Sequence, residues 1–473
     1  MKRTGVVVTV VAVAAVVGWV GATWYTGGKI EAAARRAVAD ANAANLGATG
    51  ELVSYERSLF SATSRYKVTM PLPPQGEPVT ILIDSHVNHG PLPLDRLARF
   101  QLKPVSATVD STLARNEGVG TRLKTAEADA TVRAYSVIDF NENVAFDVTT
   151  PALRMEQDGA TTEVAAGSFT GTAQKAQTLV KMEGKIASVR AATPAPNPLT
   201  IDVRDLTLNV DTRVGRFGVQ VGDSAFRIGG FTVNGSSPEG GALAVKGDSF
   251  GVAYHVVEDD KNLTGHIAYN LGKLVLNNTE LGDFDLRLAA RQLDGVATAK
   301  LANAYQKMVM TNPSAGGPDA MRQAMTVLDA PIREVVAAKP VLALDSLIWT
   351  TPLGQSTLKM EATLAPSAAN AAPSVERATV DLSVSQPALV DTIARFTKTG
   401  PGGGPITLTQ ANQQANMQVG MMVSGAAKEK LLVVKDGKIE THVTFDGKMV
   451  LINGQEPPPH LIAGLLGMVP FGQ

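Results

Sequence analysis

The sequence predicts a mainly β protein with a few helices, in which an N-terminal transmembrane helix precedes a long, curved, mostly antiparallel sheet. Residues 5–25 carry no charge, as a bilayer span requires. Beyond residue 50, apolar residues recur at every second position, which is typical of strands with one apolar face. Few helical segments separate these strands, and this favours antiparallel pairing.

Composition excludes several classes of function. The chain has 473 residues, a formal net charge of -1, 5% aromatic residues and no cysteine. A nucleic-acid partner is not expected, because such a protein needs a basic surface to neutralise phosphates. The absence of cysteine excludes disulfides, thiolate nucleophiles and cysteine metal sites.

The N-terminus indicates location. Lys2 and Arg3 precede the uncharged stretch and should stay in the cytoplasm, which places the body in the periplasm of a bacterial inner-membrane protein. Aromatic rings prefer the membrane interface, and three lie near the far end of the stretch: Trp19, Trp24 and Tyr25.

A cleaved signal peptide is the competing interpretation, with residues 20–22 as a small-residue cleavage site. Both interpretations export the body. Within the span, Ala14, Gly18 and Ala22 recur at intervals of four, a spacing that allows close helix packing and suggests a homodimer.

We expect four regions. Residues 1–28 form the cytoplasmic tip and membrane anchor, and residues 29–49 an alanine-rich helical stalk. Residues 50–294 form a β-rich periplasmic region. Residues 295–473 mix helices and strands and end in β-hairpins.

Alternation predicts the clearest strands. In residues 201–210 the apolar face changes sides near Asp205, which indicates a bulge or a hidden turn. Asp-Gly turns at 436–437 and 446–447 should join three C-terminal strands. The strands are expected at residues 79–87, 105–113, 178–189, 201–210, 250–257, 283–288, 341–349, 356–364, 378–384 and 439–445.

Two helix pairs are expected, at 296–310 with 318–339 and at 387–397 with 408–428. In the last helix the neighbouring residues Met417, Met421 and Met422 are interpreted as core residues that fill gaps, because methionine adapts to irregular spaces.

Two patterns could carry chemistry. His86 and His89 resemble a metal-binding pair, but on a strand an odd separation puts them on opposite faces. Residues 247–251 match the G-x-S-x-G spacing around Ser249, but a strand follows, where a nucleophile elbow needs a helix. Residues 246–248 are instead expected to form a hairpin turn. We therefore predict no catalytic residue, no cofactor and no metal site.

Four segments carry a resemblance to a known family: WYTGGKIE at 24–31, YERSLFS at 55–61, NHGPLPL at 88–94 and VLINGQ at 450–455. With them the chain resembles the YdgA-like family of bacterial inner-membrane proteins of unknown function. The resemblance implies an uncleaved anchor and a periplasmic body, and it implies no catalytic residue. His89, Gly90 and Pro91 then end a strand, because glycine permits unusual backbone angles and proline donates no hydrogen bond.

The function expected is that of a membrane-anchored periplasmic envelope protein. Its sheet could bind a lipid or another apolar ligand, since the alternation extends beyond the needs of a small core. The first alternative is a structural or assembly protein that acts by self-association or through another envelope protein. An enzyme is ranked last.

Overall fold

The structure is a computed structural model. It describes Arg35, Val38, Ala39 and Asn42 and residues 48–58, 61–72, 76–90, 93–114, 123–125, 130–157, 159–175, 178–236, 241–311, 318–367, 373–399 and 406–458. The chain divides into two compact units. Unit 1 comprises Met1–Gly229 and Tyr305–Thr326, and unit 2 comprises Gly230–Ala304 and Val327–Gln473.

Several expectations for the N-terminus fall outside the described residues: the span at 5–25, its stripe of Ala14, Gly18 and Ala22, and the aromatic residues Trp19, Trp24 and Tyr25. Among the helices that the structure describes, none combines the length and apolar character needed to cross a membrane.

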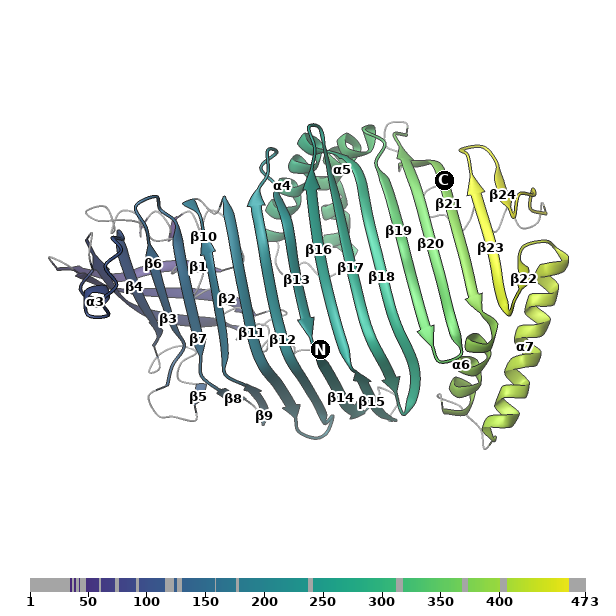
Figure 1. The fold of residues 1–473 in the computed structure, drawn as a ribbon, viewed down its shortest axis with the longest axis horizontal. Helices are drawn as coiled ribbons and strands as arrows, with labels where there is room; N and C mark the ends of the chain where they lie inside the picture. Colours follow the sequence, from purple (N-terminus) through teal and green to yellow (C-terminus); the bar gives the residue numbers. More distant parts are fainter. Residues whose placement is uncertain are drawn as a thin grey trace. The chain divides into compact units, whose positions relative to one another are not determined.

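Unit 1 is an antiparallel meander in which most neighbouring strands in the sheet are also consecutive along the chain (Figure 1). Three positions in the sheet are each filled by two successive short strands: β5 with β6, β7 with β8, and β9 with β10. The strands are β1 (Thr49–Arg57), β2 (Ser61–Leu72), β3 (Gly76–His89), β4 (Ala107–Leu113), β5 (Leu123–Thr125), β6 (Arg133–Ile138), β7 (Val144–Thr150), β8 (Leu153–Gln157), β9 (Ala160–Val164), β10 (Gly167–Ala173), β11 (Leu179–Thr193), β12 (Leu199–Val214) and β13 (Gln220–Ile228).

Short segments that are not strand interrupt this meander where the short strands meet. Residues 151–152 separate β7 from β8, and residues 165–166 separate β9 from β10. In β12, Asp205 adopts a φ of 54°, while the register with β11 is the same on both sides of it. The alternation breaks at Asp205, as the sequence indicated, and the break keeps the apolar residues on the core face, since Val203 lies opposite the buried Val189 and Leu206 opposite the buried Ile186.

The core of unit 1 lies on one face of the sheet. It contains 19 buried apolar side chains, and Tyr66 (2% exposed) is among the largest. Val38 packs against this core, and the Asn42 side chain exchanges two hydrogen bonds with the backbone of Gly50, at 2.6 and 2.8 Å. At these two residues, the segment expected to be a stalk contacts the body.

Phenylalanine rings cover glycines on neighbouring strands. Phe169 lies directly opposite Gly184, and Phe146 lies opposite Gly171. A Cβ atom at Gly184 would overlap the Phe169 ring, so the ring occupies the space that a side chain would fill. Such pairs restore apolar contact where a glycine would weaken a strand.

Unit 2 is a second antiparallel meander, and two helix pairs interrupt its sequence of strands. The first helix pair includes the Tyr305–Thr326 segment of unit 1. Its strands are β14 (Gly230–Ser236), β15 (Ala242–Gly247), β16 (Ser249–Glu258), β17 (Asn262–Leu276), β18 (Thr279–Asp294), β19 (Val341–Thr351), β20 (Gly354–Ala365), β21 (Ser374–Ser385), β22 (Val433–Lys435), β23 (Lys438–Phe445) and β24 (Val450–Ile452).

The helices lie where the sequence predicted them: α4 (Gly295–Thr311), α5 (Pro318–Ala337), α6 (Gln386–Thr399) and α7 (Leu408–Lys428). Thr407 begins α7 with a capping box, in which its hydroxyl accepts from the Gln410 backbone N–H and the Gln410 side chain accepts from the Thr407 N–H. Helices α6 and α7 share a small core with Val384 and Ile439.

Two expectations are wrong. Met417, Met421 and Met422 do not fill the core, since they are 61%, 70% and 61% exposed. Lys246–Asp248 do not form a hairpin turn. Instead β15 and β16 both pair with β17, so they form one strand interrupted at Asp248. The expected Asp-Gly turns are present, with positive φ at both Asp436 and Gly437.

The aromatic–glycine contact predicts a large stability effect. We expect Phe169→Ala to lower the free energy of unfolding by about 3–5 kcal/mol, because it removes a buried ring and opens a cavity over Gly184. Urea denaturation followed by circular dichroism measures the change. Phe226→Ala on β13 is the control, since Phe226 is 37% exposed and should cost less than half as much. Equal losses in the two variants would contradict this account.

Because Tyr66 is buried, we expect the free energy of unfolding to fall at alkaline pH. Burial raises the pKa of its hydroxyl well above the usual range. Above pH ~10 the unfolded chain releases this proton while the folded chain keeps it, so stability should fall by up to ~1.4 kcal/mol per pH unit. Urea midpoints from pH 8 to 11 should decline less steeply for Tyr66→Phe than for the natural chain. The exposed Tyr305→Phe should retain the full decline.

Candidate functional site

Unit 1 carries a polar hollow of about 830 Å³ on the face opposite its core. Side chains from β1 to β4 and from the short helix α3 (Leu94–Leu97) and its following turn line it. The residues are Val53, Ser54, Glu56, Thr63, Ser64, Arg65, Asp84, Ser85, His86, Asn88, Asp95, Arg99, Asp110 and Thr112.

The strand register assembles this hollow. Thr63, His86 and Asp110 are successive cross-strand partners on β2, β3 and β4. Arg65, Asp84 and Thr112 form the next row in the same way. Directly opposed residues on antiparallel strands point to the same face, so these two rows gather polar groups from three strands.

Two arginine–aspartate ion pairs involve several of the charged side chains in and beside this hollow. Arg65 meets Asp84 through two contacts, Nε to Oδ1 at 2.6 Å and Nη2 to Oδ2 at 3.1 Å. Arg133 on β6 also forms a bidentate ion pair, with Nε donating to Oδ1 and Nη2 to Oδ2 of Asp110. These pairs are partly exposed, so each contributes about 1 kcal/mol or less and mainly fixes the positions of the side chains.

Asp95 connects α3 to the sheet. Its Oδ1 accepts a hydrogen bond from Thr108 Oγ1 at 2.8 Å, and its Oδ2 accepts from the Tyr135 hydroxyl at 2.9 Å. Arg99 lies over the Tyr135 ring, 5.1 Å from its centroid. Burial, and then the hydrogen bond to Asp95, raise the pKa of Tyr135, so this hydroxyl remains a donor at neutral pH.

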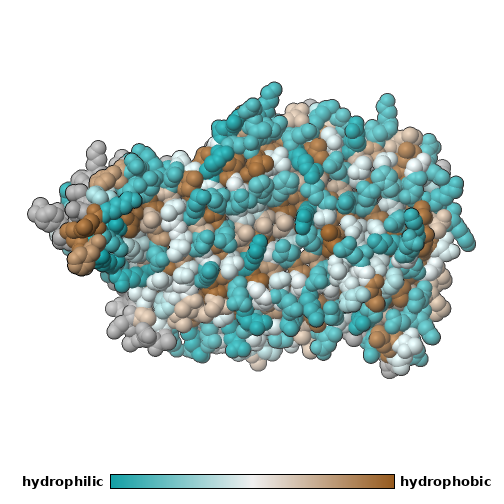
Figure 2. All heavy atoms as spheres, in the orientation of Figure 1, coloured by the Kyte–Doolittle hydropathy of each residue, from teal (hydrophilic) through white to brown (hydrophobic). Residues whose placement is uncertain are grey.

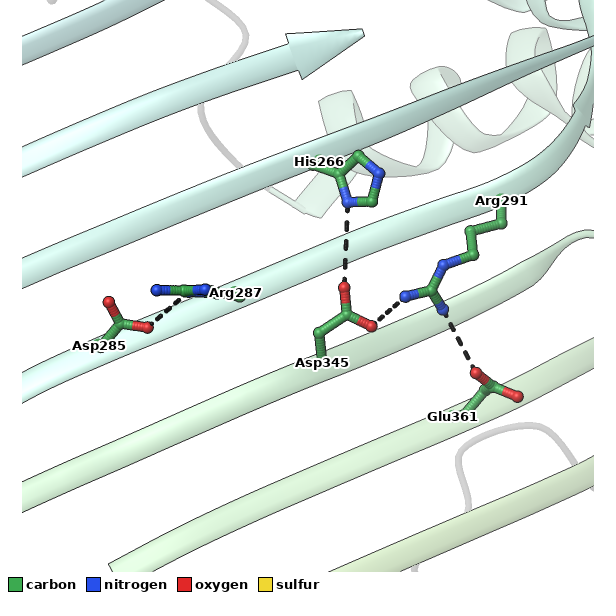
Figure 3. A network of polar contacts seen from close by, with 6 residues as sticks. All are labelled: His266, Asp285, Arg287, Arg291, Asp345 and Glu361. Carbon is green, nitrogen blue, oxygen red and sulfur yellow. Dashed lines mark hydrogen bonds and ion pairs between the residues drawn. The ribbon is translucent and has the colours of Figure 1, made fainter. Parts of the chain in front are cut away.

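Unit 2 carries a second polar network, which spans β17 to β20 (Figure 3). Asp345 lies between His266 and Arg291, with a His266 Nδ1 to Asp345 Oδ2 distance of 3.9 Å and a direct ion pair to Arg291. Arg291 also contacts Glu361, at 3.3 Å. These groups are about one-third to one-half exposed and form a solvated network rather than a pocket.

The other face of the unit 2 sheet is apolar and open. Two rows of directly opposed residues cross it, and we call these 13 residues the open apolar face. None of the 13 is fully buried, and Tyr254 and Met360 are 46% and 45% exposed. One row is Tyr254, Ile267, Leu288, Leu344, Met360, Val380 and Val443, and the other is Val252, Tyr269, Leu286, Leu347, Leu358 and Leu382.

A bulge in β19 keeps this face continuous. The pairing of β19 with β18 shifts between Arg287, which pairs with Ser346, and Leu288, which pairs with Leu344, so that Asp345 is the extra residue of the bulge. Leu344 and Leu347 then both lie on the open apolar face although they are three residues apart, while Asp345 joins the polar network. In the view of Figure 2, polar and apolar residues are interspersed over the surface.

The two histidines whose spacing resembles a metal-binding pair lie apart, on opposite faces of β3, as their odd separation predicted. His86 is exposed in the polar hollow, whereas Nε2 of His89 is buried. The strand ends at His89, and Gly90 follows with a φ of 118°. Pro91 lies outside the described residues. Among the described residues, no group of three or more histidines and carboxylates is placed to hold a metal ion.

Ser249 begins β16 and is followed by strand, so the nucleophile-elbow geometry is not formed. His442 contacts Asp381, with Nδ1 2.6 Å from Oδ1, on an exposed part of β23 and β21.

Sequence reasoning missed Arg65, Asp95 and Tyr135. Alternation alone would have put Arg65 on a polar face, but only the pairing of β2 with β3 places it against Asp84.

Removing the Asp95 carboxylate should destabilise unit 1. Asp95→Ala leaves the hydroxyls of Thr108 and Tyr135 without their acceptor, and we expect a loss of about 1–3 kcal/mol of unfolding free energy. Glu56→Ala removes an exposed carboxylate from the same hollow and should change the free energy by about 0.5 kcal/mol or less. Matching urea midpoints for the two variants would show that Asp95 does not anchor α3.

Comparisons with known proteins cover nearly the whole chain. Protein YdgA of Escherichia coli (strain K12) is 24% identical over 495 residues, which cover 99% of this chain and 97% of that protein. The uncharacterized protein YihF of the same strain is 21% identical over 477 residues, 96% of each chain. No solved structure matches. Residues 1–460 match DUF945, described as a bacterial protein of unknown function, and the chain therefore belongs to this family, which confirms the YdgA-like resemblance.

Proposed function

We propose that the chain is an envelope protein anchored in the bacterial inner membrane by residues 5–25, and that its periplasmic body binds a lipid acyl chain on the open apolar face of unit 2. The exposure of this face is the observation that carries the proposal. Thirteen apolar positions remain half-buried or exposed across seven strands, from β16 to β23.

The dimensions of the face suit an acyl chain. Neighbouring strands lie about 4.8 Å apart, so a row across seven strands extends for roughly 29 Å. One leaflet of a bilayer has a hydrocarbon depth of about 15 Å, half of the usual ~30 Å core. Each row is therefore long enough to cover an extended lipid tail.

The distribution of charge also supports an apolar ligand. The two rows contain no charged residue, whereas the opposite face carries the network of Asp345, Arg291 and Glu361. Each methylene removed from water contributes about 0.8 kcal/mol, so a tail laid along these side chains needs no polar partner there.

Self-association is the alternative. The spacing of Ala14, Gly18 and Ala22 in the expected span favours close packing of two membrane helices. A second copy could also cover the open apolar face. In the lipid proposal an acyl chain contacts Met360, whereas in the alternative a second copy of the chain contacts it. Crosslinking from this position distinguishes the two.

Photo-crosslinking tests the proposal. A photoreactive phenylalanine analogue replaces Met360, which lies on the open apolar face, or its neighbour Glu361, which lies on the polar face. After illumination in inner-membrane vesicles, mass spectrometry of the full-length chain should find phospholipid adducts at position 360 at several times the yield at position 361.

Equal yields of lipid adducts at positions 360 and 361, or no adducts at either position, would contradict the lipid proposal. Crosslinks from position 360 to a second copy of the chain would instead support self-association. Membrane anchoring has its own readout, because full-length chain recovered in the soluble fraction would exclude the anchor.

A further inference from the structure

Helix α7 exposes three methionine side chains, at 417, 421 and 422, and the packing of this helix does not explain why these positions are apolar. The buried side of α7 consists of Ala411, Ala415, Val419 and Val423, at intervals of four. With about 100° per residue, Met417 and Met421 lie roughly opposite that side and only about 40° apart. They are 61% and 70% exposed.

Two exposed thioethers one helical turn apart can reach a common point. The Cβ atoms of residues i and i+4 are about 5–6 Å apart, and the unbranched methionine side chain has three rotatable bonds. Met422 differs, because it lies about 100° around the helix from Met421 and therefore does not face the same point.

The chemistry around this pair selects for a soft cation. Thioether sulfur favours Cu(I) and similar soft ions over Mg²⁺, Ca²⁺ or Mn²⁺, which prefer oxygen ligands. Residues 406–427 contain no charged side chain, so no carboxylate within α7 offers a competing hard site and the first cationic neighbour in the helix is Lys428. The chain contains no cysteine, which leaves methionine as its soft ligand.

We propose that Met417 and Met421 chelate a soft monovalent cation, Cu(I) or Ag(I), on the exposed side of α7. The two sulfur atoms act as neutral donors. Binding therefore releases no proton and should persist at mildly acidic pH, where histidine sites lose their metal. This site is independent of lipid binding on the open apolar face.

The test uses Ag(I), which needs no reductant, and the full-length chain in mild detergent with ¹³C-labelled methionine methyl groups. Titration in chloride-free buffer should shift two of the 14 methionine methyl signals at one equivalent. Met417→Leu and Met421→Leu identify these signals, and each should raise the dissociation constant at least tenfold. An equal amount of Zn²⁺ should shift neither signal.

Met422→Leu is the matched control, because Met422 is as exposed as Met417 and lies on the same helix. It should leave the affinity for Ag(I) unchanged. Leucine and methionine have similar helix propensities, so all three variants should fold like the natural chain, which circular dichroism verifies. Unchanged Ag(I) affinity in the Met417→Leu, Met421→Leu double variant would overturn the proposal, as would the absence of a methyl shift below 1 mM Ag(I).

Discussion

The register of the antiparallel strands is the constraint on which both units depend. Directly opposed residues on neighbouring strands point to the same face, so the pairing of one strand with the next decides which side chains from distant segments meet. In unit 1 it brings Thr63, His86 and Asp110 into one polar row. In unit 2 it brings Ile267, Leu288 and Leu344 into one apolar row. A slip of one residue would exchange the polar and apolar faces.

The local signals in the sequence were sufficient for elements whose formation depends on neighbouring residues. Helix α7 spans Leu408–Lys428, the range that the helical pattern predicted. The turn at Asp436-Gly437 has the two positive φ angles that this dipeptide favours. The irregularity at Asp205 could be predicted because the alternation itself breaks there.

What the sequence could not reveal depends on contacts between segments. Methionine at 417 suggests a core position by its apolar character, but whether anything packs over it depends on which side of α7 meets α6. The dipeptide Gly247-Asp248 looks like a turn, yet both flanking strands pair with β17 and continue past it. The polar hollow needs the register of β2, β3 and β4, and register is not encoded by any single strand.

The two units differ in how they bury apolar surface, and this bears on what the open apolar face is for. Unit 1 places 19 apolar side chains in a closed core, with Tyr66 and Ile83 almost fully excluded from water. In the rows of unit 2 no side chain reaches that state, so each residue gains stability only from its neighbours on the same face.

Burial contributes about 25 cal/mol for each Å² of apolar surface, and partly exposed leucines forgo part of that contribution. Threonine is also favoured in strands, and at such partly buried positions it would expose less apolar surface to water. A sheet that needed only to fold would not require leucine or isoleucine at Ile267, Leu286 and Leu347. The apolar character of these positions is accounted for when something outside the sheet covers them, and a hydrocarbon chain meets that requirement without hydrogen bonds.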